Sequence, residues 1–370
     1  MPDSRLPLYM DIARRLIADI EAGAYACSEY LPAERDLAEQ LGVSRATLRS
    51  TLKRLETQGV LHAEHGRGHR ILPRSCAAAQ GDGLRAVALI MPFQHASTMQ
   101  PIVRGCGAAL NAAGYDIVQY DTTADTASAM RMRERTCLEG LSGKGLHGAI
   151  WWPSFPDQCH DVVRQAMASG VELVTIDRRV DGVDLDFVGV DNRAAARAAV
   201  EHLITEGHTQ IMHITQATPA STVADRRAGF EDAMAAHGIE PDEGRVLVWR
   251  SAPAERARTA HRLLASPTRP TALFCINDYV AVDVLLVLQD FGARVPDDIA
   301  IVGFDNAREC MLVRPTLSTV AQPLAAIGET AGRMLLERID RTCDTPGRRL
   351  IMPTELIVRE SSVRRSGLDP

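Results

Sequence analysis

The stretch LPAERDLAEQLGVSRATLRSTLKRLETQGV, residues 31–60, contains two helical segments separated by a tight turn. The first helix is predicted over 34–41 and the second over 45–58, with Gly42 allowing the chain to turn between them. Ser44 is a good N-cap for the second helix. Leucines at helical spacing give that helix one apolar face, so the stretch predicts a helix-turn-helix.

Segments on both sides extend this unit. Apolar residues at helical spacing predict another helix over 8–22. After the helix-turn-helix, the composition predicts a hairpin over 60–72, with its Gly-containing turn at 65–68. We therefore expect a winged helix-turn-helix domain over 1–73. The small and polar residues 74–84 are typical of a linker.

Charge is unevenly distributed along the chain. The formal net charge is −6, but residues 35–74 hold eight Lys or Arg against four Asp or Glu. Residues 75–370 hold 30 basic residues against 37 acidic ones. A basic patch on an acidic body is typical of a protein that presents one face to phosphate groups.

The second helix and the hairpin turn carry side chains suited to DNA. In a helix-turn-helix, the first residues of the second helix lie against base edges in the major groove. With its leucines inward, that helix exposes Arg45, Thr47 and Arg49, and an Arg can read guanine through two hydrogen bonds. In the turn, Arg67 is a cation suited to a narrow minor groove. A single exposed Arg is usually just a solvated helix residue, so the hypothesis depends on the whole arrangement.

Together these pieces resemble the GntR family of winged-helix regulators. The resemblance covers residues 7–73, including the Pro-Leu-Tyr lead-in at 7–9 and the Gly-Arg-Gly at 66–68. It implies a transcription regulator that binds double-stranded operator DNA. It also places the following residues at DNA-contacting positions: Arg35, Ser44, Arg45, Thr47, Arg49, His65 and Gly66.

From residue 85 onward, apolar runs suited to buried parallel strands alternate with helical segments. Such alternation predicts parallel sheets with crossover helices, and about 280 residues fit two sheets better than one. The expected strands are 86–91, 116–120, 148–152, 173–176, 187–190, 211–214, 245–249, 272–275 and 300–304. The expected helices are 101–113, 125–140, 158–168, 192–206, 225–236, 253–265, 278–290 and 323–341.

GntR-type heads are joined to several unrelated effector domains, and the residues exclude some of them. An aminotransferase-like domain needs a lysine that forms a Schiff base with pyridoxal phosphate. The only lysine beyond the head is Lys144, in a Ser-Gly-Lys-Gly turn without a supporting motif. The expected strands exclude an all-helical domain, and a smaller mixed domain would not use so many residues.

The second part resembles the LacI-type sensor, which is related to periplasmic sugar-binding proteins. The resemblance implies an α/β fold with two Rossmann-like lobes around a cleft. Lobe 1 would span about 85–178 and 320–342, lobe 2 about 179–319 and 343–362, with 363–370 as a tail. Joined to a GntR-type head, this sensor resembles the AraR type of arabinose-responsive regulator. The motifs that carry the resemblance are AVALIMP (86–92), DR (177–178), VDN (190–192), DRRAGF (225–230), FCINDYVA (274–281), VPDDIAIVGFDN (295–306) and PTLSTV (315–320).

A cleft that binds a sugar needs fixed carboxylates, amides and a bidentate Arg, with an aromatic ring to stack on the sugar. Polar residues that follow strand runs are candidates, because the carboxyl ends of strands in open sheets face such a crevice. An Asp after a strand is also often a helix N-cap, and this alternative stays open for Asp278 and Asp191. One of the neighbouring Trp151 and Trp152 is expected in the core. The resemblance places Asp177, Arg226, Asn277 and Asp305 at ligand-contacting positions, with Arg226 at the start of a helix; Phe93, Trp152, Trp249 and Asp278 complete the candidates.

No motif for catalysis, for a cofactor or for a metal is found. A Gly-x-Gly-x-x-Gly after a strand, a P-loop and a Gly-x-Ser-x-Gly elbow are all absent. The histidines lack metal spacing, and the eight cysteines are scattered. We therefore expect no enzyme, no cofactor and no metal site. Without eighteen consecutive apolar residues or an apolar signal core, a cytoplasmic protein with no membrane partner is expected.

These patterns predict a homodimeric repressor that binds a palindromic operator and is released by a pentose or hexose between the lobes. Two alternatives stay open. The same architecture could sense a nucleoside or a purine, or ligand binding could strengthen operator binding instead. An extracytoplasmic sugar-binding protein is disfavoured, because it would carry a signal sequence and no DNA-binding head.

Overall fold

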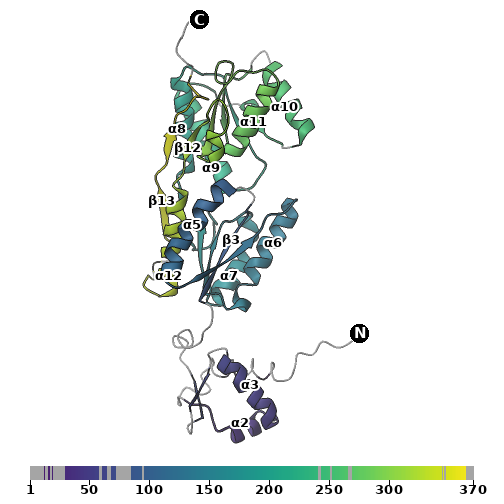
Figure 1. The fold of residues 1–370 in the computed structure, drawn as a ribbon, viewed down its shortest axis with the longest axis vertical. Helices are drawn as coiled ribbons and strands as arrows, with labels where there is room; N and C mark the ends of the chain where they lie inside the picture. Colours follow the sequence, from purple (N-terminus) through teal and green to yellow (C-terminus); the bar gives the residue numbers. More distant parts are fainter. Residues whose placement is uncertain are drawn as a thin grey trace. The chain divides into compact units, whose positions relative to one another are not determined.

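The chain divides into two compact units, Met1–Leu84 and Arg85–Pro370 (Figure 1). The fold is taken from a computed structural model. It describes residues 12, 16, 19, 30–57, 61–64, 68–71, 85–93, 96–240, 243–250, 252–265, 269–343, 345 and 347–363.

The first unit has the elements expected of a winged helix. Its described elements are α2 (Glu34–Gln40), α3 (Arg45–Thr57), β1 (Leu61–Glu64) and β2 (Gly68–Ile71). Most of the helix expected over 8–22 lies outside the described residues, but 12, 16 and 19 are helical. The predicted apolar face of α3 is confirmed, because its leucines are buried in one cluster with the Leu side chains of neighbouring segments. This cluster contains Leu16, Leu31, Leu37, Ala38, Leu48, Leu52, Leu55 and Leu61.

The second unit begins with a six-stranded parallel sheet, ordered β13-β7-β6-β5-β3-β4. Alternate side chains of β3 enter opposite cores: Val87, Leu89 and Met91 face one layer of helices, while Ala88 and Ile90 face the other. The strands are β3 (Ala86–Met91), β4 (Asp116–Asp121), β5 (Gly148–Trp151), β6 (Glu172–Ile176), β7 (Asp186–Val190) and β13 (Arg349–Met352). The helices are α5 (Ala96–Ala112) and α12 (Leu324–Ile339) on one face, and α6 (Ala127–Glu139) and α7 (His160–Ala168) on the other.

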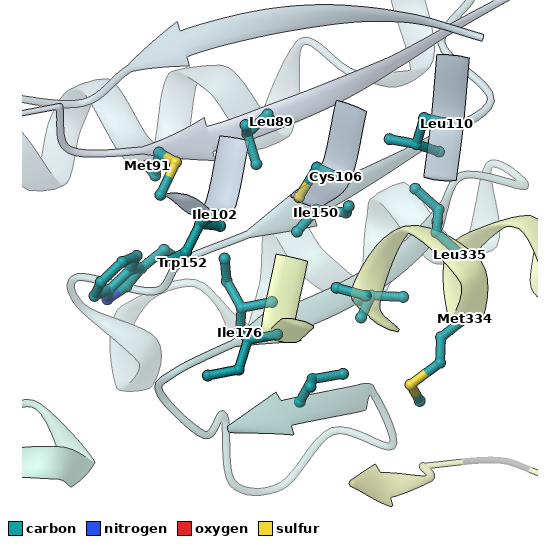
Figure 2. Packing of buried hydrophobic residues seen from close by; sticks show 14 of the residues in the cluster. Leu89, Met91, Ile102, Cys106, Leu110, Ile150, Trp152, Ile176, Met334 and Leu335 are labelled. Carbon is teal, nitrogen blue, oxygen red and sulfur yellow. The ribbon is translucent and has the colours of Figure 1, made fainter. Parts of the chain in front are cut away.

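Helices α5 and α12 pack against each other and on the same face of this sheet. Figure 2 shows Cys106 of α5 and Leu335 of α12 in one cluster with Leu89 and Ile150 of the strands. The two helices approach so closely that a Cβ at Gly105 would collide with the backbone carbonyl of Ala325. Glycine is therefore required at this contact.

A second six-stranded sheet follows, ordered β14-β12-β11-β10-β8-β9, in which only β14 is antiparallel to its neighbour. Helices α8 and α9 cover one face, and α10 and α11 cover the other. The strands are β8 (Ile211–Thr215), β9 (Val246–Val248), β10 (Ala272–Cys275), β11 (Ala300–Asp305), β12 (Ser318–Ala321) and β14 (Glu355–Ile357). The helices are α8 (Asn192–Thr205), α9 (Ser221–Ala236), α10 (Pro253–Ala265) and α11 (Asp278–Asp290); short 3₁₀ turns are η1 (Ser142–Lys144), η2 (Pro156–Gln158), η3 (Glu243–Arg245) and η4 (Arg308–Met311).

The α/β fold with two parallel-sheet lobes is confirmed, but the predicted lobe boundaries, which gave 179–319 and 343–362 to lobe 2, are corrected. Strand β7 pairs with β6, and β13 pairs with β7, so both belong to lobe 1. Strand β12 pairs with β11 in lobe 2. Lobe 1 therefore comprises 85–190 and 324–352, lobe 2 comprises 192–321 and 355–362, and the chain passes between them three times.

Strands β12, β13 and β14 were not expected from the sequence. Each has only three or four residues, and β13 and β14 are edge strands with partly exposed side chains. Neither the continuous apolar run of a buried strand nor a long alternation marks them. The remaining expected strands and helices are present, with ends shifted by a few residues.

Candidate functional site

The start of α3 is an exposed polar surface above an apolar core. Ser44 caps the helix, because its Oγ accepts a hydrogen bond from the Thr47 backbone N–H at 3.1 Å. Leu48 is fully buried, whereas Arg45 and Arg49 are exposed. The first turn of α3 as described contains no acidic residue. The partial positive charge at this helix N-terminus is therefore available to a phosphate.

Arg49 also contacts the preceding helix. Its Nε donates to Glu34 Oε2 at 2.9 Å, and its side chain is 70% exposed. Exposed ion pairs of this kind contribute only about 0–1 kcal/mol. Arg49 can therefore exchange Glu34 for another acceptor at little cost. Arg35, on α2, is exposed as well.

The wing is an antiparallel hairpin of β1 and β2. Tyr30 forms a further antiparallel bridge with Arg70, which ties the chain before α2 to the second wing strand. The turn candidates His65, Gly66 and Arg67 lie outside the described residues. Their contact with DNA stays a prediction.

Within the second unit, a cavity lies between the two lobes. It brings together five of the predicted ligand residues from segments far apart in the sequence, and many of the other lining side chains are polar. From lobe 1 come Pro92, Thr98, Met99, Trp152, Asp177 and Arg178; from lobe 2 come Gln216, Thr218, Thr222, Val223, Arg226, Ile276, Asn277, Tyr279 and Asp305; and Gln322 joins from the crossing between β12 and α12.

Arg226 is the central cation of this cavity. Its guanidinium donates to Asn192 Oδ1 at 2.8 Å and to the Ile276 carbonyl at 2.5 Å, and Nη2 lies 3.6 Å from Asp305 Oδ1. The guanidinium carbon also lies 3.6 Å from the centre of the Phe304 ring. The side chain is only 6% exposed. Arg226 was expected at a helix start, but α9 begins at Ser221, so the guanidinium is held by the second turn of that helix.

Asp305 ends β11 and enters the cavity through an unusual backbone conformation. Its φ is 115°, in the left-handed region that non-glycine residues rarely adopt. Oδ1 accepts a hydrogen bond from Gln322 Nε2 at 2.8 Å. Burial raises the pKa of this carboxyl to about 7, although the charge of Arg226 opposes the shift.

Asp177 and Arg178 form the corresponding charged pair in lobe 1. Asp177 also has a positive φ, 63°, and Arg178 Nε lies 3.5 Å from its Oδ2. Burial raises the pKa of Asp177, and Arg178 and Arg226 oppose this shift. Arg178 also donates to the Pro153 carbonyl at 3.2 Å, and its guanidinium carbon lies 5.8 Å from the Trp152 ring centre.

Among the described residues that line the cavity, the buried polar atoms without a hydrogen-bond partner include Thr98 Oγ1 and Gln322 Oε1. A buried polar atom without a partner is costly. These atoms are therefore ready to bond a ligand from both sides, one from lobe 1 and one from the crossing to lobe 2.

The lobes also contact each other directly. Arg179 of lobe 1 forms two hydrogen bonds with Asp225 of α9, at 2.6 and 3.1 Å, and its backbone N–H donates to Ser221 Oγ. Ser97 at the start of α5 donates to Glu309 Oε1 in lobe 2 at 2.6 Å. Four of these residues, Ser97, Arg179, Ser221 and Asp225, each adjoin a lining residue in sequence, so these contacts join the lobes next to segments that line the cavity.

The structure does not bring Phe93, Trp249 and Asp278 into the lining of the cavity, contrary to expectation. Phe93 packs half-buried against the lobe 1 core. Trp249 is buried in the core of lobe 2, where its indole N–H donates to Asp283 Oδ2 at 2.7 Å. Asp278 is fully buried behind the cavity and accepts hydrogen bonds from the Ala307 N–H and the Thr319 hydroxyl.

The open questions about caps and tryptophans are also answered. Asn277 both lines the cavity and caps α11, with Oδ1 accepting from the Val280 N–H at 2.9 Å. Asp191 caps α8. Trp152 lines the cavity, whereas Trp151 is fully buried. Sequence reasoning missed Arg178, although it directly follows Asp177, and missed Thr98, Gln216, Tyr279 and Gln322, which no strand end or motif marks.

Fold and cavity together define a two-lobed α/β binding domain of the periplasmic-binding-protein type, preceded in the chain by a winged-helix head. Two protein families match: the periplasmic binding protein-like domain over residues 200–362, and the bacterial regulatory proteins of the gntR family over residues 8–71.

Several known transcription regulators are similar to this chain. The arabinose metabolism transcriptional repressor of Geobacillus stearothermophilus is 28% identical over 98% of this chain and 99% of that protein. The HTH-type transcriptional repressor PurR of Aliivibrio fischeri (strain MJ11) is 31% identical over 68% of this chain and 73% of that protein. The solved transcriptional regulator CelR–cellobiose complex is 25% identical, with a TM-score of 0.64, and the match covers 90% of this chain and all of that one. The chain belongs to the family of bacterial transcription regulators that combine a GntR-type DNA-binding domain with a LacI-type, periplasmic-binding-protein-like domain.

No described helix is long and apolar enough to cross a membrane. No group of three or more His, Cys, Asp or Glu in the described part of the chain is placed to hold a metal ion.

Proposed function

We propose that this protein is a cytoplasmic, dimeric repressor whose operator binding is weakened by a neutral sugar held between its lobes, and that it is not an enzyme. The observation that carries the proposal is the buried Arg226–Asp305 pair in the cavity, with free polar atoms on both sides. Such a set of fixed carboxylate, amide and guanidinium groups suits the many hydroxyls of a sugar.

Charge favours a neutral ligand over an anionic one. Each guanidinium in the lining already has a carboxyl group as its partner: Arg178 lies beside Asp177, and Arg226 lies beside Asp305. A phosphate or carboxylate ligand would have to displace one of these partners in a buried site. A pentose or hexose needs no such exchange.

The relatives support the same reading. The similarity to an arabinose metabolism repressor extends over nearly the whole length of both chains, and one solved relative is a complex with cellobiose. The PurR relatives favour a second candidate, a purine or nucleoside, in the same cavity. The stacking surface of Trp152 would serve either ligand.

Two measurements test the proposal. Duplexes that the purified protein selects from a random library define its operator, and a two-fold symmetric sequence is expected of a dimer. Thermal shift and calorimetry with pentoses, hexoses, cellobiose, hypoxanthine and guanine then identify the ligand. A sugar should raise the melting temperature and release the selected duplex. A response to purines alone would contradict the sugar, and tighter operator binding with sugar would reverse the sign of regulation.

A further inference from the structure

One carboxylate outside the cavity is buried more completely than those that line it. Glu134, on α6, is fully buried. Its Oε1 accepts hydrogen bonds from Trp151 Nε1 at 2.8 Å and from the Ser154 N–H at 2.6 Å, and Oε2 accepts from the Phe155 N–H at 3.0 Å. A buried carboxylate is expensive unless several donors surround it, and here three do.

All three donors belong to one segment, 151–155, which leaves the carboxyl end of β5. This segment presents Trp152 to the cavity. Its Pro153 carbonyl accepts a hydrogen bond from Arg178 Nη1 at 3.2 Å. Glu134 thus binds this segment from the side away from the cavity. The backbone of the same segment carries Trp152 and accepts the hydrogen bond from Arg178.

The charge of Glu134 acts on the same cation. Arg178 is buried, which disfavours its charged form and lowers its pKa, while Asp177 and Glu134 both oppose that shift. Asp177 is itself one of the residues that line the ligand space. A second anion behind the cavity wall therefore stabilises Arg178 without occupying that space.

We infer that Glu134 is a positioning residue for the ligand cleft, which sets the location of Trp152 and Arg178 through segment 151–155 and thereby the affinity for the ligand. This inference rests on the proposed ligand-binding function of the cavity. A binding site held within a fraction of an ångström by surrounding hydrogen bonds binds more tightly than a loosely supported one.

The test uses Glu134→Gln in the full-length protein. The Gln amide nitrogen cannot accept a hydrogen bond, so it would face the Ser154 or the Phe155 N–H with another donor. We expect the calorimetric Kd for the ligand to rise about tenfold, the effect of losing one such interaction. Affinity for the selected operator duplex without ligand should stay within about twofold, because the hydrogen-bond donors to Glu134 all belong to segment 151–155 of the second unit.

Hydrogen exchange supplies a readout that does not depend on the ligand. Exchange of the Ser154 and Phe155 amides should increase in Glu134→Gln, while exchange in β3 and β5 stays unchanged. Glu139→Gln is the matched control on the same helix, since Glu139 is 46% exposed and pairs only at the surface with Arg135. It should alter neither Kd nor exchange.

The outcomes separate this inference from the proposed function. The wild-type protein is titrated with L-arabinose, D-ribose, D-xylose, D-glucose, D-galactose, cellobiose, hypoxanthine and guanine. If only hypoxanthine or guanine binds, the sugar proposal fails, and the Kd of Glu134→Gln is measured for that purine instead. If none binds, both fall. A wild-type Kd in Glu134→Gln overturns the inference alone. If Glu134→Gln does not fold, Trp151→Phe is measured instead, because it removes one donor and keeps the carboxylate. An unchanged ligand Kd in Trp151→Phe also overturns the inference.

Discussion

The head and the cleft place their candidate residues in opposite ways. In the head, Arg35 to Arg49 lie on two consecutive helices, and the arginines among them are exposed. In the cleft, the lining extends from Pro92 to Gln322 and draws on both sheets. A surface that reads a large, charged partner can be built locally, whereas a cavity that encloses a small neutral one needs walls from distant segments.

The ion pairs of the two regions also differ in how much they affect stability. The side chain of Arg49 is 70% exposed and that of Arg226 is 6% exposed, although each faces one carboxylate. Removing a partner from an exposed pair changes stability little, while removing it from a buried pair leaves an unpaired charge in the interior. Substitutions in the two regions should therefore separate binding from folding.

The largest effect is expected for Arg226→Ala. This change removes the cation that pairs with the Asp305 carboxylate and leaves Asn192 Oδ1 and the Ile276 carbonyl without their shared donor. We expect the free energy of unfolding to fall by about 3–5 kcal/mol, measured by urea denaturation, together with loss of ligand binding. Arg197→Ala, which breaks an exposed pair with Glu201, should change stability by less than about 1 kcal/mol. Equal changes in the free energy of unfolding for both substitutions would refute the contrast between the buried pair and the exposed pair.

The second effect is a pH dependence that Asp305→Asn should remove. Burial raises the pKa of Asp305 to about 7 from a model-peptide value of 3.8. The folded protein therefore holds this proton more tightly than the unfolded chain, so its contribution to stability declines from about pH 4 to pH 7 and is constant above. Urea denaturation between pH 5 and 8 should show a shallower decline for the variant. Parallel curves would show that Asp305 is ionised throughout this range.

The third effect concerns the head alone. Arg49→Ala should weaken binding to the selected operator by roughly 1–3 kcal/mol if Arg49 reads a base, while ligand Kd stays at the wild-type value. Glu34→Gln removes the partner of Arg49 but keeps the cation, so mobility shifts should show no loss of affinity. An Arg49→Ala protein with normal operator binding at physiological salt would remove this residue from the interface.

The smallest effect is expected at the contact between the lobes. Asp225→Asn weakens the paired hydrogen bonds to Arg179 that join lobe 1 to α9, and a several-fold rise in the ligand Kd should follow. Asp232→Asn is the control on the same helix, since its pair with Arg193 lies wholly within lobe 2. Comparable calorimetric Kd values for both variants would mean that the Arg179 contact does not affect the arrangement of the lobes that binds the ligand.

The elements of the fold were predictable from the sequence wherever a pattern was long enough to be distinct. The six-residue apolar run of β3 is buried on both faces, so composition alone indicates a central parallel strand. Strands β13 and β14 have no such mark, because an edge strand is stabilised by a neighbour that lies far away in sequence. The lobe boundaries were wrong for the same reason: pairing of β7 with β13 decides them, and pairing is not a local property.

Which individual residues line the cleft could be predicted only in part from the sequence. Position after a strand run suggested Asp177, Asn277, Asp278 and Asp305, and of these only Asp278 does not line the cavity. Asp177 and Asp305 have a positive φ, and nothing in their local sequence signals this backbone conformation. The prediction that Trp249 lines the cavity was wrong for a similar reason. The side of the sheet that a residue at a strand end faces depends on the register of the strand, and β9 has only three residues.

The three passages of the chain between the lobes have a consequence for synthesis on the ribosome. Lobe 1 lacks an edge strand until β13 is made, and lobe 2 awaits Ser361, whose hydroxyl donates to the Ile301 carbonyl at 2.6 Å. The head is contained in the first 84 residues. Because domains fold as they emerge, the head is complete about 280 residues before the sensor can finish. A prematurely terminated chain would therefore carry a DNA-binding unit that no ligand controls, and responsiveness is the last property that the growing polypeptide acquires.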